Sequence, residues 1–199
     1  MKKFGYEERE VSDIKKLAGG GSKTMRRKSM HEIAELSGKI KKTDEKMEEE
    51  MTKEFIDFYS KNINTKSKLI TGVVEFLVWC KNNSISMAVC TNKQEHLSID
   101  LLKKIKIYHF FDYVAGGNTF NYNKPNPKHL TDTLEIIGGN IKKTIMIGDS
   151  ETDSNAAKAA NIPFVLIEGS YTEKRTNEIY HDHVVKDFVN LENTIKKYL

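Results

Sequence analysis

The stretch Ile145-Met146-Ile147-Gly148-Asp149-Ser150-Glu151-Thr152-Asp153 contains the strongest fold signal in the chain. It begins as an apolar run short enough to be a buried strand, and it changes to carboxylates directly after Gly148. An alanine-rich run follows at residues 156–160 and predicts a helix. Open α/β sheets place their ligands beyond the carboxyl ends of their strands, where such a strand turns into a helix. The stretch therefore predicts an α/β fold with a ligand site at this turn.

Two carboxylates of this turn, Asp149 and Asp153, are four residues apart. If the turn leads directly into the helix, both can point into the same crevice. Mg²⁺ is commonly held by one or two carboxylates and keeps water and phosphate as its other ligands, so the pair is a candidate magnesium site. The other interpretation is that Asp153 or Ser150 caps the helix. The residues alone leave both interpretations open.

The composition indicates a soluble chain with a basic surface. At 199 residues it can bury a good core and form one domain or two. The net charge is +4, and the lysines are spread along the chain. We therefore expect a solvated basic surface that helps to attract an anionic substrate, and no nucleic-acid partner.

The two cysteines, Cys80 and Cys90, lie in no CxxC pair and have no histidine at metal-ligand spacing. They fall in a predicted helix and a predicted strand, so we expect both to be reduced core residues. The longest apolar stretch, at about residues 70–80, contains Glu75 and is too short to span a bilayer. The N-terminus carries no hydrophobic signal region. These features predict a cytoplasmic protein with no membrane partner.

The chain divides by periodicity into two parts, residues 1–67 and 68–199. The first part is typical of helices, broken at Gly19-Gly20-Gly21 and ending in a polar linker at about residues 62–68. The glycine triplet either ends a helix or contacts a phosphate, and the sequence leaves both open.

In the second part, short apolar strands alternate with helices. We expect strands at about residues 86–90, 111–115, 143–148, 163–167 and 183–185, and helices at about 73–79, 95–106, 127–137, 156–160 and 190–198. Such alternation predicts a parallel sheet with right-handed crossovers.

Polar residues of related chemistry follow three of the predicted strands. Thr91 and Asn92 supply a hydroxyl and helix-starting N–H groups, which suit a phosphate oxygen. Lys124 is a cation held rigidly by the proline after it, and the third strand ends at Asp149 and Asp153. Each alone has a plainer explanation, such as a helix cap or a surface lysine. Together they predict a phosphoryl site, where catalysis is mainly positioning and neutralisation of charge.

These motifs carry a family resemblance that covers nearly the whole chain. Residues 89–93 (VCTNK), 116–119 (GGNT) with 124–127 (KPNP), and 147–153 (IGDSETD) together resemble the haloacid dehalogenase (HAD) superfamily, and within it the phosphoglycolate phosphatases. The resemblance implies a Rossmann-like core of three layers, α/β/α, over residues 68–199. It also implies that residues 1–67 form a helical cap that closes over and selects the substrate, with Gly20 of the Gly-rich turn in contact with it.

The resemblance also implies roles for the site residues. Thr91 would bind the transferring phosphoryl group, with the Asn92 backbone beside it. Lys124 would neutralise the phosphoryl group and the nucleophile. Asp149 would ligate Mg²⁺, and Asp153 would support the metal through water or through indirect contacts. The implied reaction is Mg²⁺-dependent hydrolysis of a small phosphorylated metabolite, such as 2-phosphoglycolate, through an aspartyl-phosphate.

The sequence departs from the family pattern at its start. The family's first motif is an apolar strand ending in Asp-x-Asp, which supplies the nucleophile and the general acid/base. Nothing in residues 1–20 fits: Asp13 lies in a helical pattern, and Asp44 lies in a charged run. We therefore expect the first core strand to be missing, as in a truncated or misassigned start. Two neighbouring strands would then have unpaired edges, and turnover by this chain alone would be impaired.

Four alternatives to a phosphatase that is complete in this chain remain to be weighed, and one of them is completion of the site in trans by a separate N-terminal peptide. An esterase with Ser150 of Gly-Asp-Ser as nucleophile needs a late Asp-x-x-His, which His181-Asp182-His183 does not supply. The pair His181 and His183 could bind a metal, although alternating residues before a short strand are typical of a surface. A non-catalytic remnant would bind phosphate without hydrolysing it. The sequence does not indicate an oligomeric state.

Overall fold

The computed structural model describes residues 45–65, 67–169 and 174–198. The glycine triplet with Gly20, and most of the expected cap at residues 1–67, lie outside the described residues. The cap boundary and the predicted absence of a first core strand therefore stay predictions.

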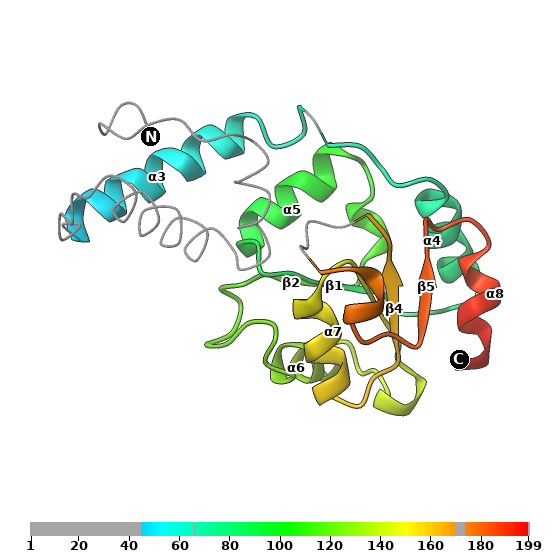
Figure 1. The fold of residues 1–199 in the computed structure, drawn as a ribbon. Coiled ribbons are helices and arrows are strands. Elements are labelled where there is room, and N and C mark those ends of the chain that lie inside the picture. The colour runs from blue at the N-terminus through cyan, green and yellow to red at the C-terminus, as the bar shows by residue number, and fades with distance from the viewer. Residues whose placement is uncertain (1–44, 66, 170–173, 199) are drawn as a thin grey trace.

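The described elements alternate between helices and strands as the sequence predicted (Figure 1). In chain order they are α3 (Glu45–Lys61), α4 (Val73–Asn82), β1 (Ala88–Cys90), α5 (Glu95–Lys104), η3 (Tyr108–Phe110), β2 (Tyr113–Ala115), α6 (Lys128–Ile136), η4 (Ile141–Lys143), β3 (Met146–Gly148), α7 (Glu151–Ala159), β4 (Phe164–Ile167), η5 (Thr176–Glu178), β5 (His183–Val185), α8 (Leu191–Ile195) and η6 (Lys196–Tyr198).

All described strand pairs are parallel, which confirms the predicted α/β class. β1 pairs with β2, and β3, β4 and β5 pair in that order. Within the described part of the chain these are two separate sheets, because no ladder joins β1 to β3. Among the described residues no strand lies between β1 and β3, and the predicted absence of a central strand stays a prediction.

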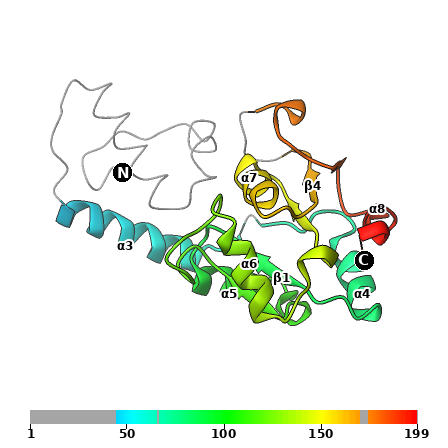
Figure 2. The ribbon, with the colours of Figure 1, turned by 90° about the horizontal axis from the view of Figure 1, so that it is seen from below.

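The side chains of β4 divide the core into two halves. Phe164 and Leu166 pack into one cluster, with the alanines of α7 and with Leu130 of α6. Val165 points to the opposite face and packs with residues of α4 and α8, namely Phe76, Cys80, Leu191 and Ile195. This alternation follows from the two-residue period of a strand, and it places helices on both faces of the sheet. The result is the predicted α/β/α layering (Figure 2).

Some predicted strands are shorter in the structure because polar side chains hold their flanks in turns. The predicted strand 143–148 is reduced to β3, since Ile141–Lys143 forms a 3₁₀ turn. Asn140 stabilises this turn: its side chain accepts a bond from the Lys142 N–H at 2.9 Å, and its carbonyl accepts one from the Thr144 hydroxyl at 2.7 Å.

Helix α3 extends away from the end of the molecule that holds α8 and the C-terminus (Figures 1 and 2). Two lysines connect it to the core. Lys93 donates to the Tyr59 hydroxyl at 2.6 Å, and Lys104 donates to the Ser60 carbonyl at 3.3 Å. None of the helices that the structure describes has the length and apolar character needed to cross a membrane.

Candidate active site

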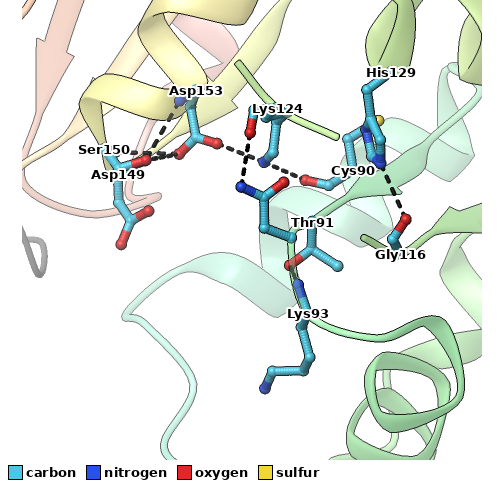
Figure 3. A network of polar contacts seen from close by, with 10 residues as sticks. Cys90, Thr91, Lys93, Gly116, Lys124, His129, Asp149, Ser150 and Asp153 are labelled. Atoms are coloured by element: carbon cyan, nitrogen blue, oxygen red, sulfur yellow. Dashed lines mark hydrogen bonds and ion pairs between the residues drawn. The ribbon is translucent and has the colours of Figure 1, made fainter. Parts of the chain in front are cut away.

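A buried ion pair joins the two sheets at the carboxyl ends of their strands (Figure 3). The Lys124 Nζ lies 2.5 Å from Asp153 Oδ1, and it also donates to the Cys90 carbonyl, again at 2.5 Å. Cys90 ends β1, and Asp153 lies in the first turn of α7, directly after β3. The Lys124 side chain is only 7% exposed. The sequence prediction that these strand ends converge is therefore confirmed by the geometry.

The second oxygen of Asp153 is used by the start of α7. Its Oδ2 accepts bonds from the Asp149 N–H at 3.1 Å, the Ser150 N–H at 3.1 Å and the Ser150 hydroxyl at 2.8 Å. The Ser150 hydroxyl in turn accepts from the Asp153 N–H, which completes a capping box. Of the two interpretations of this turn, the cap is thus correct for Ser150 and Asp153.

The pKa of Asp153 reflects this surrounding. Burial alone would raise it, but the charge of Lys124 and hydrogen bonds from Lys124, Ser150 and the Asp149 N–H hold the pKa below its ordinary value. Asp153 is therefore an ionised carboxylate that fixes Lys124, with both of its oxygens engaged.

Gly148 allows Asp153 to reach this position. A Cβ added at Gly148 would lie 2.6 Å from the Asp153 Cβ and 2.7 Å from its Oδ2. Any side chain at residue 148 would therefore displace the carboxylate. The close approach explains why the strand ends in glycine.

Asp149 is the carboxylate that remains for a ligand. Its side chain points away from Lys124 in Figure 3, and no described lysine or arginine forms an ion pair with it. Desolvation, followed by the charge of Asp153, raises its pKa above the ordinary value. The Asp149 side chain is exposed to solvent, and a carboxylate without a cation partner among the described residues fits Mg²⁺, whose oxygen ligands are hard carboxylates, phosphate and water. The described residues contain no cluster of three or more metal-ligating side chains, so phosphate and water would complete the coordination.

Thr91 and Asn92 lie directly after β1, as predicted, and face different partners. The Thr91 N–H donates to the Ala115 carbonyl at 2.9 Å, and the Thr91 hydroxyl oxygen accepts from the Lys93 N–H at 3.2 Å. The Asn92 side chain donates to the Lys124 carbonyl at 2.9 Å, while its Oδ1 is buried without a partner. Asn92 thus holds the segment that carries Lys124.

Helix α5 begins at Glu95, as predicted, so the N–H groups next to Thr91 lie in a loop before the helix. The Glu95 N–H donates to the Asn118 side chain at 2.8 Å. The loop after β2 fits closely against residues 92–95, since a Cβ at Gly117 would lie 2.5 Å from the Asn92 carbonyl oxygen. A loop from a neighbouring strand therefore caps this helix.

His129 is a polar residue of this region that sequence reasoning missed. It is completely buried, and its Nε2 lies 3.1 Å from the Gly116 carbonyl oxygen. A carbonyl only accepts, so Nε2 carries the proton, and the buried Nδ1 has no partner. Burial lowers the pKa of His129, which keeps the ring neutral beside Lys124. Its flanking residues give no signal that the ring points inward.

The described histidines do not assemble an esterase or a histidine metal site. The Ser150 hydroxyl bonds to Asp153, as above. The rings of His181 and His183 bond separately, to the Ile179 carbonyl and to the Tyr198 hydroxyl, each at 2.8 Å. Neither a Ser–His pair nor a converging His181–His183 pair is present in the part of the chain that the structure describes.

Comparisons with known proteins agree with this geometry. The family model for haloacid dehalogenase-like hydrolases matches residues 1–167. A phosphoglycolate phosphatase from Mesorhizobium japonicum is 37% identical over 138 residues, which are 69% of this chain and 61% of that protein. The chain thus spans about three fifths of the length of this curated relative.

Solved structures show the same fold. The structure of a predicted phosphoglycolate phosphatase from Haemophilus somnus matches with a TM-score of 0.90 and 22% identity, over 97% of this chain and 85% of that one. A β-phosphoglucomutase from Clostridium difficile matches with a TM-score of 0.75 and 22% identity, over 99% of this chain and 85% of that one. With a family match over most of its length, the chain belongs to the haloacid dehalogenase-like hydrolases.

Proposed function

We propose that the chain provides the phosphoryl site of a Mg²⁺-dependent phosphomonoester hydrolase of the phosphoglycolate phosphatase type. The observation that carries this proposal is the convergence of a buried ammonium, Lys124, with the acidic turn at Asp149 and Asp153. The name of the Mesorhizobium relative supports phosphoglycolate as the substrate to test first.

Each residue has a part that follows from its position. The Thr91 hydroxyl, at the end of β1, can donate to a phosphoryl oxygen. Lys124 neutralises phosphoryl charge, and Asp153 keeps its ammonium in place. Asp149 would hold Mg²⁺, which supplies further neutralisation and orients the phosphoryl group when bound. In such a site, catalysis comes mainly from positioning and electrostatic stabilisation.

The proposal also includes a cap over the substrate and a location in the cytoplasm. Residues 1–67 would close over the substrate, and α3 is the largest described part of this segment. A small phosphorylated metabolite in the cytoplasm would be the partner.

The second candidate is a phosphate-binding protein without turnover. It is favoured by the sequence, which contains no Asp-x-Asp pair at any position. The family resemblance implies that such a pair supplies the nucleophile, so binding and hydrolysis have to be measured separately.

The test is hydrolysis of phosphoglycolate and of p-nitrophenyl phosphate with Mg²⁺, together with binding of inorganic phosphate. Asp149→Asn removes the proposed metal ligand, and Asp100→Asn is the matched control, since Asp100 only pairs with Lys104 on the surface of α5. Hydrolysis that is lost in Asp149→Asn but kept in Asp100→Asn supports the enzyme. Binding without hydrolysis supports the second candidate, and the absence of both contradicts the proposed site.

A further inference from the structure

Lys93 is held by Tyr59 beside the proposed phosphoryl site. It lies two residues after Thr91 in the loop that leaves β1, and Tyr59 lies near the end of α3. The Lys93 Nζ donates to the Tyr59 hydroxyl at 2.6 Å and lies 5.0 Å from the centre of its ring. The ammonium is thus fixed by a phenol that comes from the other part of the chain.

The positive charge of Lys93 is not neutralised by a carboxylate among the described residues. The described ion pairs of the core use other lysines, among them Lys81, Lys104 and Lys124. Glu95 is the nearest acidic residue in the sequence, and its carboxylate accepts a hydrogen bond from the Thr119 hydroxyl instead. Contact with the Tyr59 ring and hydroxyl supplies no carboxylate as a counter-charge to Lys93.

The position of Lys93 relative to the phosphoryl site limits what it can bind. Its N–H donates to the Thr91 hydroxyl oxygen at 3.2 Å, so its backbone borders the group proposed to bind phosphate. In Figure 3 its side chain leaves the loop on the side away from Lys124. A ligand with its phosphoryl group between Thr91 and Lys124 would therefore meet the second cation with its remaining part, on the side of Thr91 that faces away from Lys124.

From this geometry we infer that Lys93, positioned by Tyr59, binds a second anionic group of the substrate, a carboxylate on a short linker. The inference rests on the proposed function and assigns to Lys93 the preference for a small phosphorylated acid over a phosphomonoester with an uncharged remainder. Lys124 and Lys93 then have separate roles: Lys124 neutralises the phosphoryl group, and Lys93 binds the carboxylate of the substrate.

The chain offers a matched control for Lys93. Lys103 also lies over a tyrosine ring, with its Nζ 5.1 Å from the centre of Tyr108, but it is exposed near the end of α5. Lys93→Met and Lys103→Met remove the same charge and keep most of the side-chain volume. Tyr59→Phe removes the hydroxyl that fixes Lys93 and keeps the ring.

The test is calorimetric titration, with Mg²⁺ present, of two ligands that cannot be hydrolysed. 3-Phosphonopropionate carries a carboxylate at the distance found in phosphoglycolate, and propylphosphonate carries a methyl group in its place. We expect the protein to prefer the first by about tenfold, the size expected for a hydrogen bond to a charged group. Lys93→Met should abolish the preference and leave propylphosphonate binding within about twofold, while Lys103→Met keeps the preference and Tyr59→Phe reduces it.

Equal binding of the two ligands by the unchanged protein, or a preference that survives in Lys93→Met, overturns the inference and leaves the phosphoryl site standing. A loss of both ligands in Lys93→Met also overturns it, since Lys93 would then act on the phosphoryl group or on the fold. Failure of the unchanged protein to bind either ligand overturns the proposed function and this inference with it.

Discussion

Lys124 Nζ and Asp153 Oδ1 lie 2.5 Å apart, and this buried pair is the contact that connects the loop before α6 to the start of α7. The two residues differ in the number of other hydrogen-bond partners that they have. Asp153 keeps three further donors on its second oxygen, whereas the only other partner of the Lys124 ammonium among the described residues is the Cys90 carbonyl. Stability and binding should respond to this asymmetry.

We predict that Asp153→Asn destabilises the fold more than Lys124→Met. The asparagine can still cap α7, but it leaves the Lys124 ammonium buried without a counter-charge, at a cost of about 3 kcal/mol. Methionine at residue 124 leaves Asp153 bonded to Ser150 and the Asp149 N–H. Urea unfolding, followed by the fluorescence of Trp79, gives both values. Equal losses, or a double variant whose loss equals the sum of the two, would contradict the pairing.

Gly148→Ala should disturb the Lys124–Asp153 pair by displacing the Asp153 carboxylate. The new Cβ would lie 2.6 Å from the Asp153 Cβ, so Asp153 must shift. Overpacking of this kind costs about 1–3 kcal/mol, and we expect weaker phosphate binding as well, because Lys124 loses its fixed position. Unfolding and phosphate titration of the same sample test this. Unchanged phosphate affinity would show that Asp153 does not position Lys124.

His129 should make stability fall in mildly acidic solution. Burial lowers its pKa below the ordinary 6.5, so below pH 6.5 the unfolded chain binds a proton that the folded chain does not. The free energy of unfolding should therefore drop as the pH falls below 6.5, by at most about 1.4 kcal/mol per pH unit, with no contribution above it.

The matched comparison for His129 is His129→Phe, which keeps a ring against Phe120. Urea unfolding at pH 7.5 and 5.5 should show a smaller loss in the variant than in the unchanged protein, since all other titrating groups are shared. The same loss in both proteins would mean that His129 is not kept neutral by the fold.

Both cysteines should be unreactive in the native protein. Cys80 is 2% exposed, and burial raises its pKa to about 11; burial also raises the pKa of Cys90. Only the thiolate reacts, so a disulfide reagent should label neither thiol until the chain unfolds. Labelling rates with and without urea measure this. Rapid native labelling of Cys90, identified in Cys80→Ala, would place its thiol in contact with solvent.

The sequence predicted the elements well where a single stretch carries the information. Apolar runs located β1 to β5, and Pro127 correctly marked the start of α6. Contacts between residues that are far apart in the sequence could not be predicted. The Lys124–Asp153 pair spans 29 positions, and the cap that Asn118 provides for α5 spans 23. Neither has a local pattern, because both depend on how loops from different strands meet.

The sequence also did not predict which polar side chains are buried. His129 lies on the buried side of α6, and its partner there is the Gly116 carbonyl, which comes from a different loop and leaves no mark in the sequence around His129. The three strand-end motifs were located because each contains polar residues that directly follow an apolar run, and parallel strands bring such ends to one edge of a sheet.

The most direct test of the central claim is the effect of Mg²⁺ on phosphate affinity, measured by calorimetric titration of the protein, Asp149→Asn and Asp100→Asn. If Thr91, Lys124 and Asp149 form one site, Mg²⁺ should tighten phosphate binding at least about tenfold in the unchanged protein and in Asp100→Asn, and should have no effect in Asp149→Asn. Phosphate binding that does not depend on Mg²⁺, or a dependence that persists in Asp149→Asn, would contradict the account.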